Sequence, residues 1–348
     1  MTTRTQTSSI LQISGESGGG QLLRSALSLS MVTGQPFRMT NIRGKRPKPG
    51  LMRQHLTCVK AAAEVCNAAV DGAELGSVEL VFAPGPIQAG DYAFNIGSGG
   101  STTLVLQTLL PALLHAEGAS TLRIEGGTHN PMAPPFEFIQ QCFLPVLQSM
   151  GVKAEVALER HGFMQAGGGV LTATISPVKK WKKLKLLERG ELQEHFGRVL
   201  HAHLHRDIAQ REISVAAQVL DWPEERLELR YANDSAGPGN ALLLGARFAN
   251  VCEISTGIAQ MGKSAEAVAT GAAKGLKSYL ASEAAVGVHL ADQLLLPLAL
   301  AGGGEFTTLT LSNHVQTNMA LIERFLSVQF AVNERAGGVK HIELRAGK

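Results

Sequence analysis

A glycine-rich turn followed by an apolar helical stretch occurs three times along the chain, and this repetition constrains the fold more than any other feature. The copies are GESGGGQLLRSALSLSMVTG from Gly15, GSGGSTTLVLQTLLPALLHAEG from Gly97 and AAVGVHLADQLLLPLALAGGG from Ala284. A second amphipathic helix is predicted after each copy, at 51–68, 136–151 and 315–326. Alternating segments such as STLRIEG and EFTTLTL are typical of strands. We therefore predict three β/α units.

The spacing of the three copies predicts an insertion. The first two begin 82 residues apart, whereas the third begins 187 residues after the second. The excess of about 105 residues is the size of a small domain, and the intervening region contains its own turn, NDSAGPGN, and its own strand-like and helical segments. We predict an α/β (α+β) fold in which a large domain of three repeated β/α units, residues 1–184 and 281–348, is interrupted by an inserted small α/β domain, residues 185–280.

The composition is that of a globular protein. Hydrophobic residues make up 45% and charged residues 18% of the 348 positions, which excludes an intrinsically disordered chain. We predict no membrane-spanning helix, because no uninterrupted apolar run reaches about 18 residues. The N-terminal MTTRTQTSS is polar and is interpreted as a loose tail. The four cysteines form no C-x-x-C pair, which predicts reduced, mostly buried thiols and a cytoplasmic or nuclear setting.

The basic residues are unevenly distributed. No Asp or Glu occurs from Ser17 to Ala63, and this interval holds eight cations: Arg24, Arg38, Arg43, Lys45, Arg46, Lys48, Arg53 and Lys60. Several are mixed with Gly and Pro in IRGKRPKPG, which favours an exposed loop that attracts phosphates of a nucleotide or a nucleic acid. A solvated basic face is the alternative. A second cluster, KKWKKLK at 179–185, is a weaker signal and could be a solvated connector.

The first glycine loop, GESGGGQLLR, lies directly before a predicted helix. Glycines there can turn backbone N–H groups toward an anion, and the helix dipole assists. The loop matches neither the Walker pattern nor G-x-G-x-x-G, so it is a weak signal by itself. Arg24 falls one turn into the helix, where its guanidinium could bind a phosphate.

Two groups of histidines are candidate sites. His201, His203 and His205 alternate in HAHLHRD, so on a strand all three would project from one face. We interpret them as an ordinary polar strand face and not as a zinc site, because no carboxylate or cysteine partner is evident nearby.

The second candidate is His314. With Asn313 as N-cap and Gln316 at N3, it would be the first residue of a helix. The positive helix end would favour a neutral, nucleophilic imidazole and would attract a phosphate that the ring could attack. A histidine that only hydrogen-bonds its neighbours is the alternative, and the residues alone favour it.

A series of motifs runs in order along nearly the whole chain: GGGQLLRSALSLSMVTGQPF, KPGLMRQHL, TLVLQTLLPALL, GGTHNPMAPP, RHGF with AGGGV, AAVG with LADQLLLPLALAG, and SNHVQTN with ERFL. In these motifs the chain resembles the RNA 3′-terminal phosphate cyclase family. The family fold, three related β/α units with an inserted smaller domain, agrees with the spacing.

The resemblance implies an ATP-dependent ligase-type enzyme that acts in RNA processing. A histidine would attack ATP and become adenylylated, and AMP would then pass to the 3′-phosphate of RNA. The vicinal 2′-hydroxyl would close a 2′,3′-cyclic phosphate and expel AMP. A divalent metal, Mg or Mn, would offset charge on the leaving pyrophosphate. RNA 3′-phosphate ends would be the partners.

The resemblance also assigns roles to individual residues. His314 would accept AMP. The nucleotide pocket would comprise Gln107, Pro134, Phe138, His289 and Asp292, and the substrate phosphate contacts would be Arg24, Arg43 and Gln54.

Three positions depart from the family pattern. Ser17 stands where the family has a metal-binding glutamate, so either Glu16 serves as the metal ligand or metal use is weakened. His289 replaces an adenine-stacking tyrosine, and Gln165 replaces a usual proline.

Two other functions compete with the cyclase hypothesis. One is a non-catalytic relative that binds RNA or assists ribosome assembly, but such relatives lack the histidine. The other is a small-molecule transferase of the similarly repeated enolpyruvyl-transferase architecture, against which the histidine motif and the basic first unit count.

Overall fold

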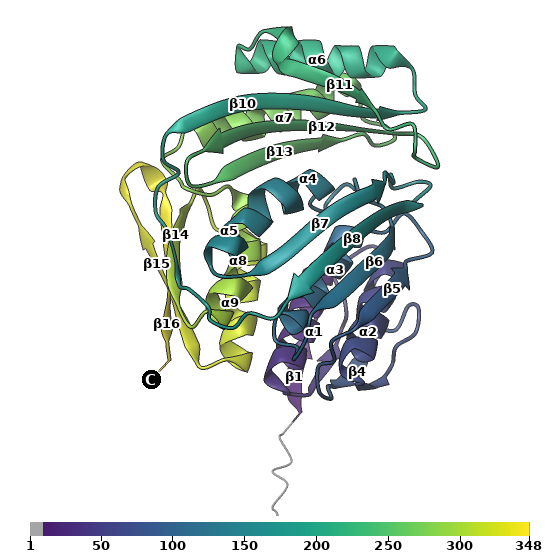
Figure 1. Ribbon diagram of the computed structural model, residues 1–348, viewed down its shortest axis with the longest axis vertical. Helices are drawn as coiled ribbons and strands as arrows, with labels where there is room; N and C mark the ends of the chain where they lie inside the picture. Colours follow the sequence, from purple (N-terminus) through teal and green to yellow (C-terminus); the bar gives the residue numbers. More distant parts are fainter. Residues whose placement is uncertain (1–9, 348) are drawn as a thin grey trace, which may run out of the picture.

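The computed structural model describes residues 10–347, so the segment interpreted as a loose tail, residues 1–9, lies outside the described residues. The described chain has the predicted mixed α+β fold, with four four-stranded sheets. Figure 1 shows one sheet and two helices as an upper layer, with the other sheets and helices beneath it. None of the helices in this described range is both long and apolar enough to cross a membrane.

The first sheet is built from residues 11–83. Its strands are, in spatial order, β1 (Leu11–Ser14), β2 (Phe37–Thr40), β4 (Leu80–Ala83) and β3 (Ala69–Asp71). Helix α1 (Gly19–Thr33) joins β1 to β2, and α2 (Arg53–Cys66) lies between β2 and β3. Phe37 and Met39 on β2 are fully buried, whereas Arg38 between them is exposed, which is the two-residue period of a strand with one buried face.

The second sheet follows directly. Its strands are β5 (Asp91–Asn95), β6 (Ser120–Gly126), β8 (Gly169–Ser176) and β7 (Lys153–Arg160). Helix α3 (Thr102–Leu113) joins β5 to β6. The next helical stretch consists of α4 (Phe136–Phe138), a π-helical segment η1 (Ile139–Phe143) and α5 (Leu144–Ser149). The predicted strand STLRIEG coincides with β6.

The third sheet combines a short strand from the middle of the chain with the C-terminal region. Its strands are β9 (Leu184–Leu186), β14 (Gly304–Thr308), β16 (Lys340–Ala346) and β15 (Val328–Glu334). Helices α8 (Val288–Leu300) and α9 (Asn313–Phe325) belong to this part, and a short 3-10 segment, η3 (Ala336–Gly338), lies between β15 and β16.

These three sheets have the same connectivity. When the four strands of each sheet are counted along the chain, the first and second strands pair in parallel. The second and third strands each pair antiparallel with the fourth, which lies between them. Helices α3 and α8 also carry a proline at the same helical position, Pro111 and Pro297. We propose on this basis that the three β/α units are structural repeats.

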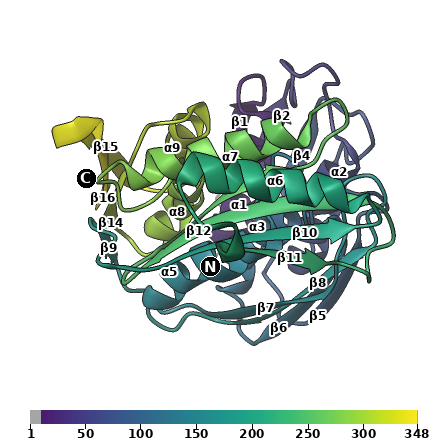
Figure 2. The ribbon, with the colours of Figure 1, turned by 90° about the horizontal axis from the view of Figure 1, so that it is seen from above.

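The fourth sheet lies between β9 and α8. Its strands are β11 (Leu227–Tyr231), β10 (Leu192–Ala202), β12 (Gly239–Phe248) and β13 (Cys252–Ile258). Helices α6 (Arg206–Leu220) and α7 (Ala265–Leu280) cover one face, as Figure 2 shows, and a 3-10 turn, η2 (Glu224–Arg226), precedes β11.

The side chains of β12 alternate between two cores. Leu242 and Leu244 pack with α6 and α7, whereas Ala241 and Leu243 face the core of the rest of the molecule. This separate core supports the predicted inserted domain. Because β9 pairs with β14, we propose that the insertion begins after Leu186.

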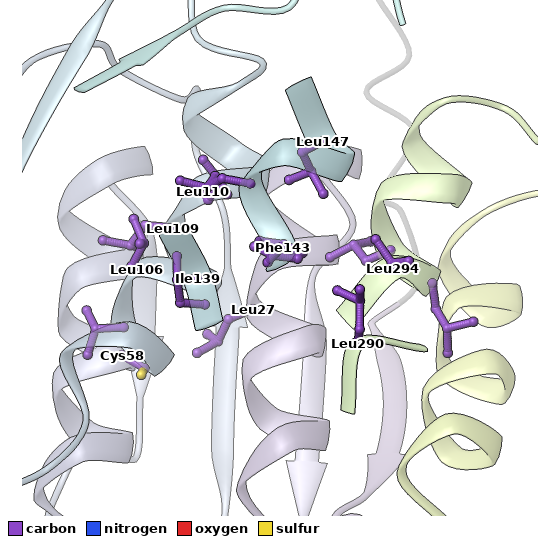
Figure 3. Packing of buried hydrophobic residues seen from close by; sticks show 14 of the residues in the cluster. Leu27, Cys58, Leu106, Leu109, Leu110, Ile139, Phe143, Leu147, Leu290 and Leu294 are labelled. Atoms are coloured by element: carbon purple, nitrogen blue, oxygen red, sulfur yellow. The ribbon is translucent and has the colours of Figure 1, made fainter. Parts of the chain in front are cut away.

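The main core includes buried side chains from α1, α3 and α8. Leu27 of α1, Leu109 of α3 and Leu290 of α8 are fully buried, and Ile139 of η1 packs with them. Figure 3 shows these side chains converging from helices that are far apart in sequence. Packing of α1 against α3 and α9, and of α8 against α9, fixes the relative positions of the polar residues that these helices carry.

Candidate functional site

A cavity of about 440 Å³ lies among α1, α3, the 130–135 loop, β13, α8 and the start of α9. Seven of the residues predicted from the sequence line it: Arg24, Gln107, Pro134, Phe138, His289, Asp292 and His314. Arg43, Gln54 and Glu16 do not belong to this lining. The fold therefore places seven of the ten candidates on one cavity.

His314 lies at the start of α9, but one prediction about this helix end is wrong. Ser312, not Asn313, is the N-cap residue, and His314 is the second residue of the helix. The reason is that the Ser312 hydroxyl accepts a hydrogen bond from the Val315 N–H at 3.2 Å. With Ser312 as N-cap, Val315 takes position N3, so Gln316 cannot complete a capping box, and its side chain donates to the Leu311 carbonyl.

A hydrogen-bonded chain links His314 to Asp292 through Gln21 on α1. Gln21 Nε2 donates to Asp292 Oδ1 at 2.5 Å, and Gln21 Oε1 contacts His314 Nδ1. Because the amide oxygen of Gln21 can only accept, His314 Nδ1 carries the ring hydrogen. In the neutral ring this leaves a lone pair on Nε2, which is the nucleophilic form.

Asp292 is held on all sides by polar groups. Burial raises the pKa of this carboxyl, and the hydrogen bond from Gln21, the His314 ring, the Arg24 guanidinium and Asn318 all act to lower it. Asn318 Nδ2 on α9 donates to Asp292 Oδ1 at 3.3 Å. Asp292 thus joins α1, α8 and α9, the three helices that hold the histidine.

Two consecutive hydrogen bonds of glutamine side chains connect α3 to α8 at the cavity wall. Gln107 Nε2 donates to Gln293 Oε1, and Gln293 Nε2 donates to the His289 carbonyl at 3.1 Å. Desolvation lowers the pKa of His289, Asp292 raises it and His314 lowers it further. The net shift favours a neutral His289 ring, which can lie against a base without carrying charge.

Another part of the lining is apolar. Pro134 and Phe138 belong to it, and the Thr103 hydroxyl holds the loop by donating to the Pro134 carbonyl at 2.7 Å. The cavity therefore offers both apolar surface and a neutral imidazole, a combination that suits a nucleobase.

A basic cluster surrounds the first glycine loop. His55 Nδ1 accepts from the Met52 N–H at 3.2 Å, so the ring hydrogen resides on Nε2, which faces Gly20. A Cβ at Gly20 would overlap this ring, so only glycine fits there. Burial, with help from Arg24 and Arg43, lowers the pKa of His55 to about 3. The buried ring is therefore a neutral N–H donor between two guanidinium groups.

Arg43 is held at the edge of this cluster. Its backbone is left-handed (φ 56°), and Nη1 donates to the carbonyls of Lys48 and Gly50, both at 2.8 Å. Gln54 serves a different contact, because its Oε1 accepts from the Ser101 N–H at 3.1 Å at the start of α3.

The residues present do not assemble a metal site. Glu16 and Ser17 are both exposed, and the nearest cation to Glu16 is Lys45, 3.9 Å away. Within residues 10–347, no cluster of three or more His, Cys, Asp or Glu is arranged to hold a metal ion. Asp292, the carboxylate that lines the cavity, already accepts hydrogen bonds from Gln21 and Asn318.

The expectation that His201, His203 and His205 form one polar strand face is wrong. β10 ends at Ala202, His203 is left-handed (φ 50°), and His205 is the N-cap of α6. His201 alone lies on the strand and is buried, where it contacts Asn240 at 3.2 Å. The chain leaves the sheet between the first and second histidines, which separates their side chains.

Two residues of the site were missed in the sequence. Gln21 lies three positions before Arg24, so helical spacing puts both on one face of α1. His55 lies in the acid-free basic interval and directly follows Gln54. Neither signal identifies a partner, because His314 is nearly 300 residues away from Gln21 in the chain.

The fold and the cavity together define a class of protein: an α+β protein with a basic, histidine-bearing cavity that suits a phosphorylated ligand. Comparison with known sequences identifies the family within that class. The sequence profile of RNA 3′-terminal phosphate cyclase matches residues 15–332, which is most of the chain. The chain belongs to the RNA 3′-terminal phosphate cyclase family.

Individual relatives agree with this assignment. A protein of Ectopseudomonas mendocina named RNA 3′-terminal phosphate cyclase is 48% identical over 97% of this chain and 98% of its own. One with the same name from Koribacter versatilis is 52% identical over 91% of this chain and 89% of its own. Among solved structures, EPSP synthase from Acinetobacter baumannii matches 97% of this chain and 48% of its own at 12% identity, with a TM-score of 0.30, which is too weak to bear on the fold.

Proposed function

We propose that this protein converts the 3′-phosphate of an RNA into a 2′,3′-cyclic phosphate at the expense of ATP, with His314 as the AMP acceptor. The observation that carries the proposal is the Asp292–Gln21–His314 chain, because it supports a ring with a free Nε2 lone pair beside a cavity suited to a nucleotide. Family membership and the names of the relatives support the substrate class.

The first step is attack of His314 Nε2 on the α-phosphorus of ATP. A P–N bond forms, the P–O bond to the β-phosphate breaks, and pyrophosphate leaves with the electron pair. The ring becomes cationic but keeps its Nδ1–H directed at Gln21. Asp292, at the other end of the chain of hydrogen bonds, offsets this charge through the Gln21 amide.

The second and third steps transfer AMP and close the ring. An oxygen of the RNA 3′-phosphate attacks the adenylyl phosphorus, the P–N bond breaks, and His314 returns to its neutral form. The RNA 2′-hydroxyl then attacks the activated 3′-phosphorus and loses its proton, and AMP departs. Arg24, Arg43 and His55 would stabilise the phosphate oxygens as charge develops, since two are cations and the third is a neutral donor.

The nucleotide is proposed to lie with its base between His289 and the wall formed by Pro134 and Phe138. Gln107 would have to exchange its hydrogen bond with Gln293 for one to the ligand. Gln54 is proposed to act on substrate phosphate indirectly, by holding the backbone at the start of α3.

A divalent ion, Mg or Mn, is part of the family resemblance, and Glu16 is its candidate ligand. Because the described residues do not form a metal site, no step of the proposed reaction is routed through the ion. The expectation is checked by adenylylation with and without EDTA. A Ser17→Glu variant whose adenylylation rises sharply would show that the missing loop carboxylate limits metal use.

A cytoplasmic location is also part of the proposal. All four cysteines, Cys58, Cys66, Cys142 and Cys252, are free and buried, as expected for thiols that stay reduced.

The test of the whole reaction uses an RNA oligonucleotide with a 3′-phosphate, ATP and Mg²⁺ or Mn²⁺. The proposal expects a product resistant to phosphatase at its 3′ end, and expects none from an RNA ending in a 3′-hydroxyl. Loss of product in His314→Ala supports the assignment. If the wild type binds the RNA but yields no cyclic product, the non-catalytic RNA-binding relative is the better description.

A further inference from the structure

Glu253 connects the inserted segment to the helix that carries part of the cavity. It lies on β13, is 5% exposed, and its Oε2 accepts a hydrogen bond from the Gly287 N–H at 3.0 Å. Gly287 is the N-cap residue of α8. The carboxyl group therefore touches the first turn of a helix that belongs to a different part of the fold.

The backbone at this position has a donor without a partner inside the helix. The first N–H groups of a helix, that of the N-cap residue among them, have no acceptor within the helix. Glu253 provides an acceptor from another strand, in a position that the helix dipole favours. A Cβ on Gly287 would overlap the Glu253 carboxyl oxygens, so the glycine and the glutamate fit only as a pair.

The capped turn leads directly into the cavity. Val288 and His289 follow Gly287 and line it, and Asp292 lies one turn further along α8. Asp292 is held independently by Gln21 and Asn318. Loss of the cap would thus loosen the turn that bears His289 while leaving the hydrogen bonds of Asp292 in place.

We infer that Glu253 is a positioning residue for nucleotide binding: from the inserted segment it fixes the first turn of α8 and thereby the place of His289 against the base of ATP. This inference rests on the proposed function for the identity of the ligand. It makes the inserted segment part of the nucleotide site without direct contact between Glu253 and the nucleotide.

The surroundings of Glu253 explain why one hydrogen bond matters there. Burial raises the pKa of Glu253 to about 7, and the bond from Gly287 opposes the shift. The titratable groups that interact with it are Tyr279 of α7, Cys142 of η1 and the adjacent Cys252. A neutral glutamine can keep the acceptor oxygen, which provides a conservative variant.

The experiment measures the KM for ATP and the maximal rate of enzyme adenylylation, without RNA, for four variants. Glu253→Ala should raise the KM about tenfold, because the buried acceptor of the Gly287 N–H is lost, and should change the maximal rate less than about threefold. Glu253→Gln should stay within about threefold of wild type in both. Gly287→Ala should raise the KM like Glu253→Ala, and the double variant should be no worse than either single variant, since the overlap disappears with the carboxyl group.

Glu212 provides the matched control. It is a buried glutamate of α6 in the same inserted segment, its pKa is also raised to about 7 by burial, and its contact is with Asn240 and not with α8. Glu212→Ala should lower the melting temperature and leave the KM for ATP unchanged. Amide hydrogen exchange at Val288, His289 and Leu290 should accelerate in Glu253→Ala and not in Glu212→Ala.

The possible results separate this inference from the proposed function. If wild type becomes adenylylated normally and Glu253→Ala has an unchanged KM for ATP, Glu253 is structural only and the inference is wrong. An equal rise in KM for Glu212→Ala would also overturn it. A wild type that forms no adduct overturns the proposed function and the inference with it. An unchanged KM in Glu253→Ala, or an equal rise in Glu212→Ala, overturns the inference and leaves the proposed function intact.

Discussion

At the scale of single residues, the site depends on which nitrogen of each histidine carries hydrogen. Met52 N–H fixes His55 with its donor on Nε2, and Gln21 fixes His314 with its donor on Nδ1. The two rings thus have opposite tautomers and opposite roles. In the proposed reaction, His55 would present its N–H to a phosphate oxygen, and His314 would present its lone pair to the α-phosphorus.

A Gln21→Leu variant tests the tautomer argument. It keeps the size of the side chain but removes both hydrogen bonds, so His314 loses its fixed orientation and its link to Asp292. We expect the adenylylation rate at saturating ATP to fall about 10- to 100-fold, which corresponds to about 1.5–3 kcal/mol for bonds to charged groups. Gln148→Leu, which removes a comparable bond to the Ala154 carbonyl far from the cavity, serves as control. An unchanged rate in Gln21→Leu would contradict the assignment.

At the scale of elements, the position of His314 depends on how helix α9 begins. Ser312 caps the helix, His314 follows two positions later, and Val315, Met319 and Ile322 bury the opposite face. The cap fixes the first turn, while the buried face fixes the rotation of the helix about its axis. Together they decide where the histidine lies.

Replacing the cap of α9 should affect function as well as stability. Ser312→Ala removes the acceptor for Val315 N–H and should cost about 1 kcal/mol of unfolding free energy. The adenylylation rate should also fall. Ser264→Ala removes the equivalent cap of α7, where the hydroxyl accepts from Ala267 N–H, and should cost similar stability with no change in rate. Equal rates in the two variants would show that the α9 cap does not position His314.

Most elements could be predicted from the sequence because each carries its own local signal. Period and apolar content indicated α9 and β6, and the excess spacing between the second and third glycine-rich copies indicated the insertion. Signals failed where two neighbouring residues compete for the same role. Ser312 and Asn313 are both good N-caps, and only the backbone decides between them. The prediction that the alternating histidines share a strand face is wrong for a similar reason, since the left-handed backbone at His203 has no clear marker in the sequence.

The candidate site was harder to predict than the fold. Composition and spacing indicated the basic interval and His314, and the family resemblance supplied Gln107, Pro134, Phe138, His289 and Asp292. The contacts among them are long-range, because Gln21 and His314 come from opposite ends of the chain. Arg43, Gln54 and Glu16 lie in the correct region but outside the cavity lining. Their predicted contacts would require a ligand or a loop shift that the sequence cannot specify.

At the scale of the whole molecule, buried carboxyl groups make stability depend on pH. Burial raises the pKa of Glu212 and of Glu253 from 4.5 to about 7. Between these values the folded chain holds a proton that the unfolded chain has released. The stability from each group is therefore full below about pH 4.5 and is lost as the pH rises through 7.

Glu212→Gln isolates one of these contributions. A pKa difference of roughly 2.5 units corresponds to about 3 kcal/mol, so the unfolding free energy of wild type relative to Glu212→Gln should decrease by about that amount from pH 4.5 to pH 7.5. Urea unfolding at a series of pH values measures the difference. A difference that stays constant over this range would mean that Glu212 is ionised in the folded protein throughout.

The central claim, that His314 accepts AMP, is tested most directly by the covalent adduct itself. The protein is incubated with α-labelled ATP and a divalent ion, denatured, and examined for label that is lost in acid and stable in base, as expected for a P–N bond. Peptide mapping should place the label on His314, and His314→Ala should carry none. Label on another residue, equal labelling of His314→Ala, or a wild type that remains unlabelled would contradict the account.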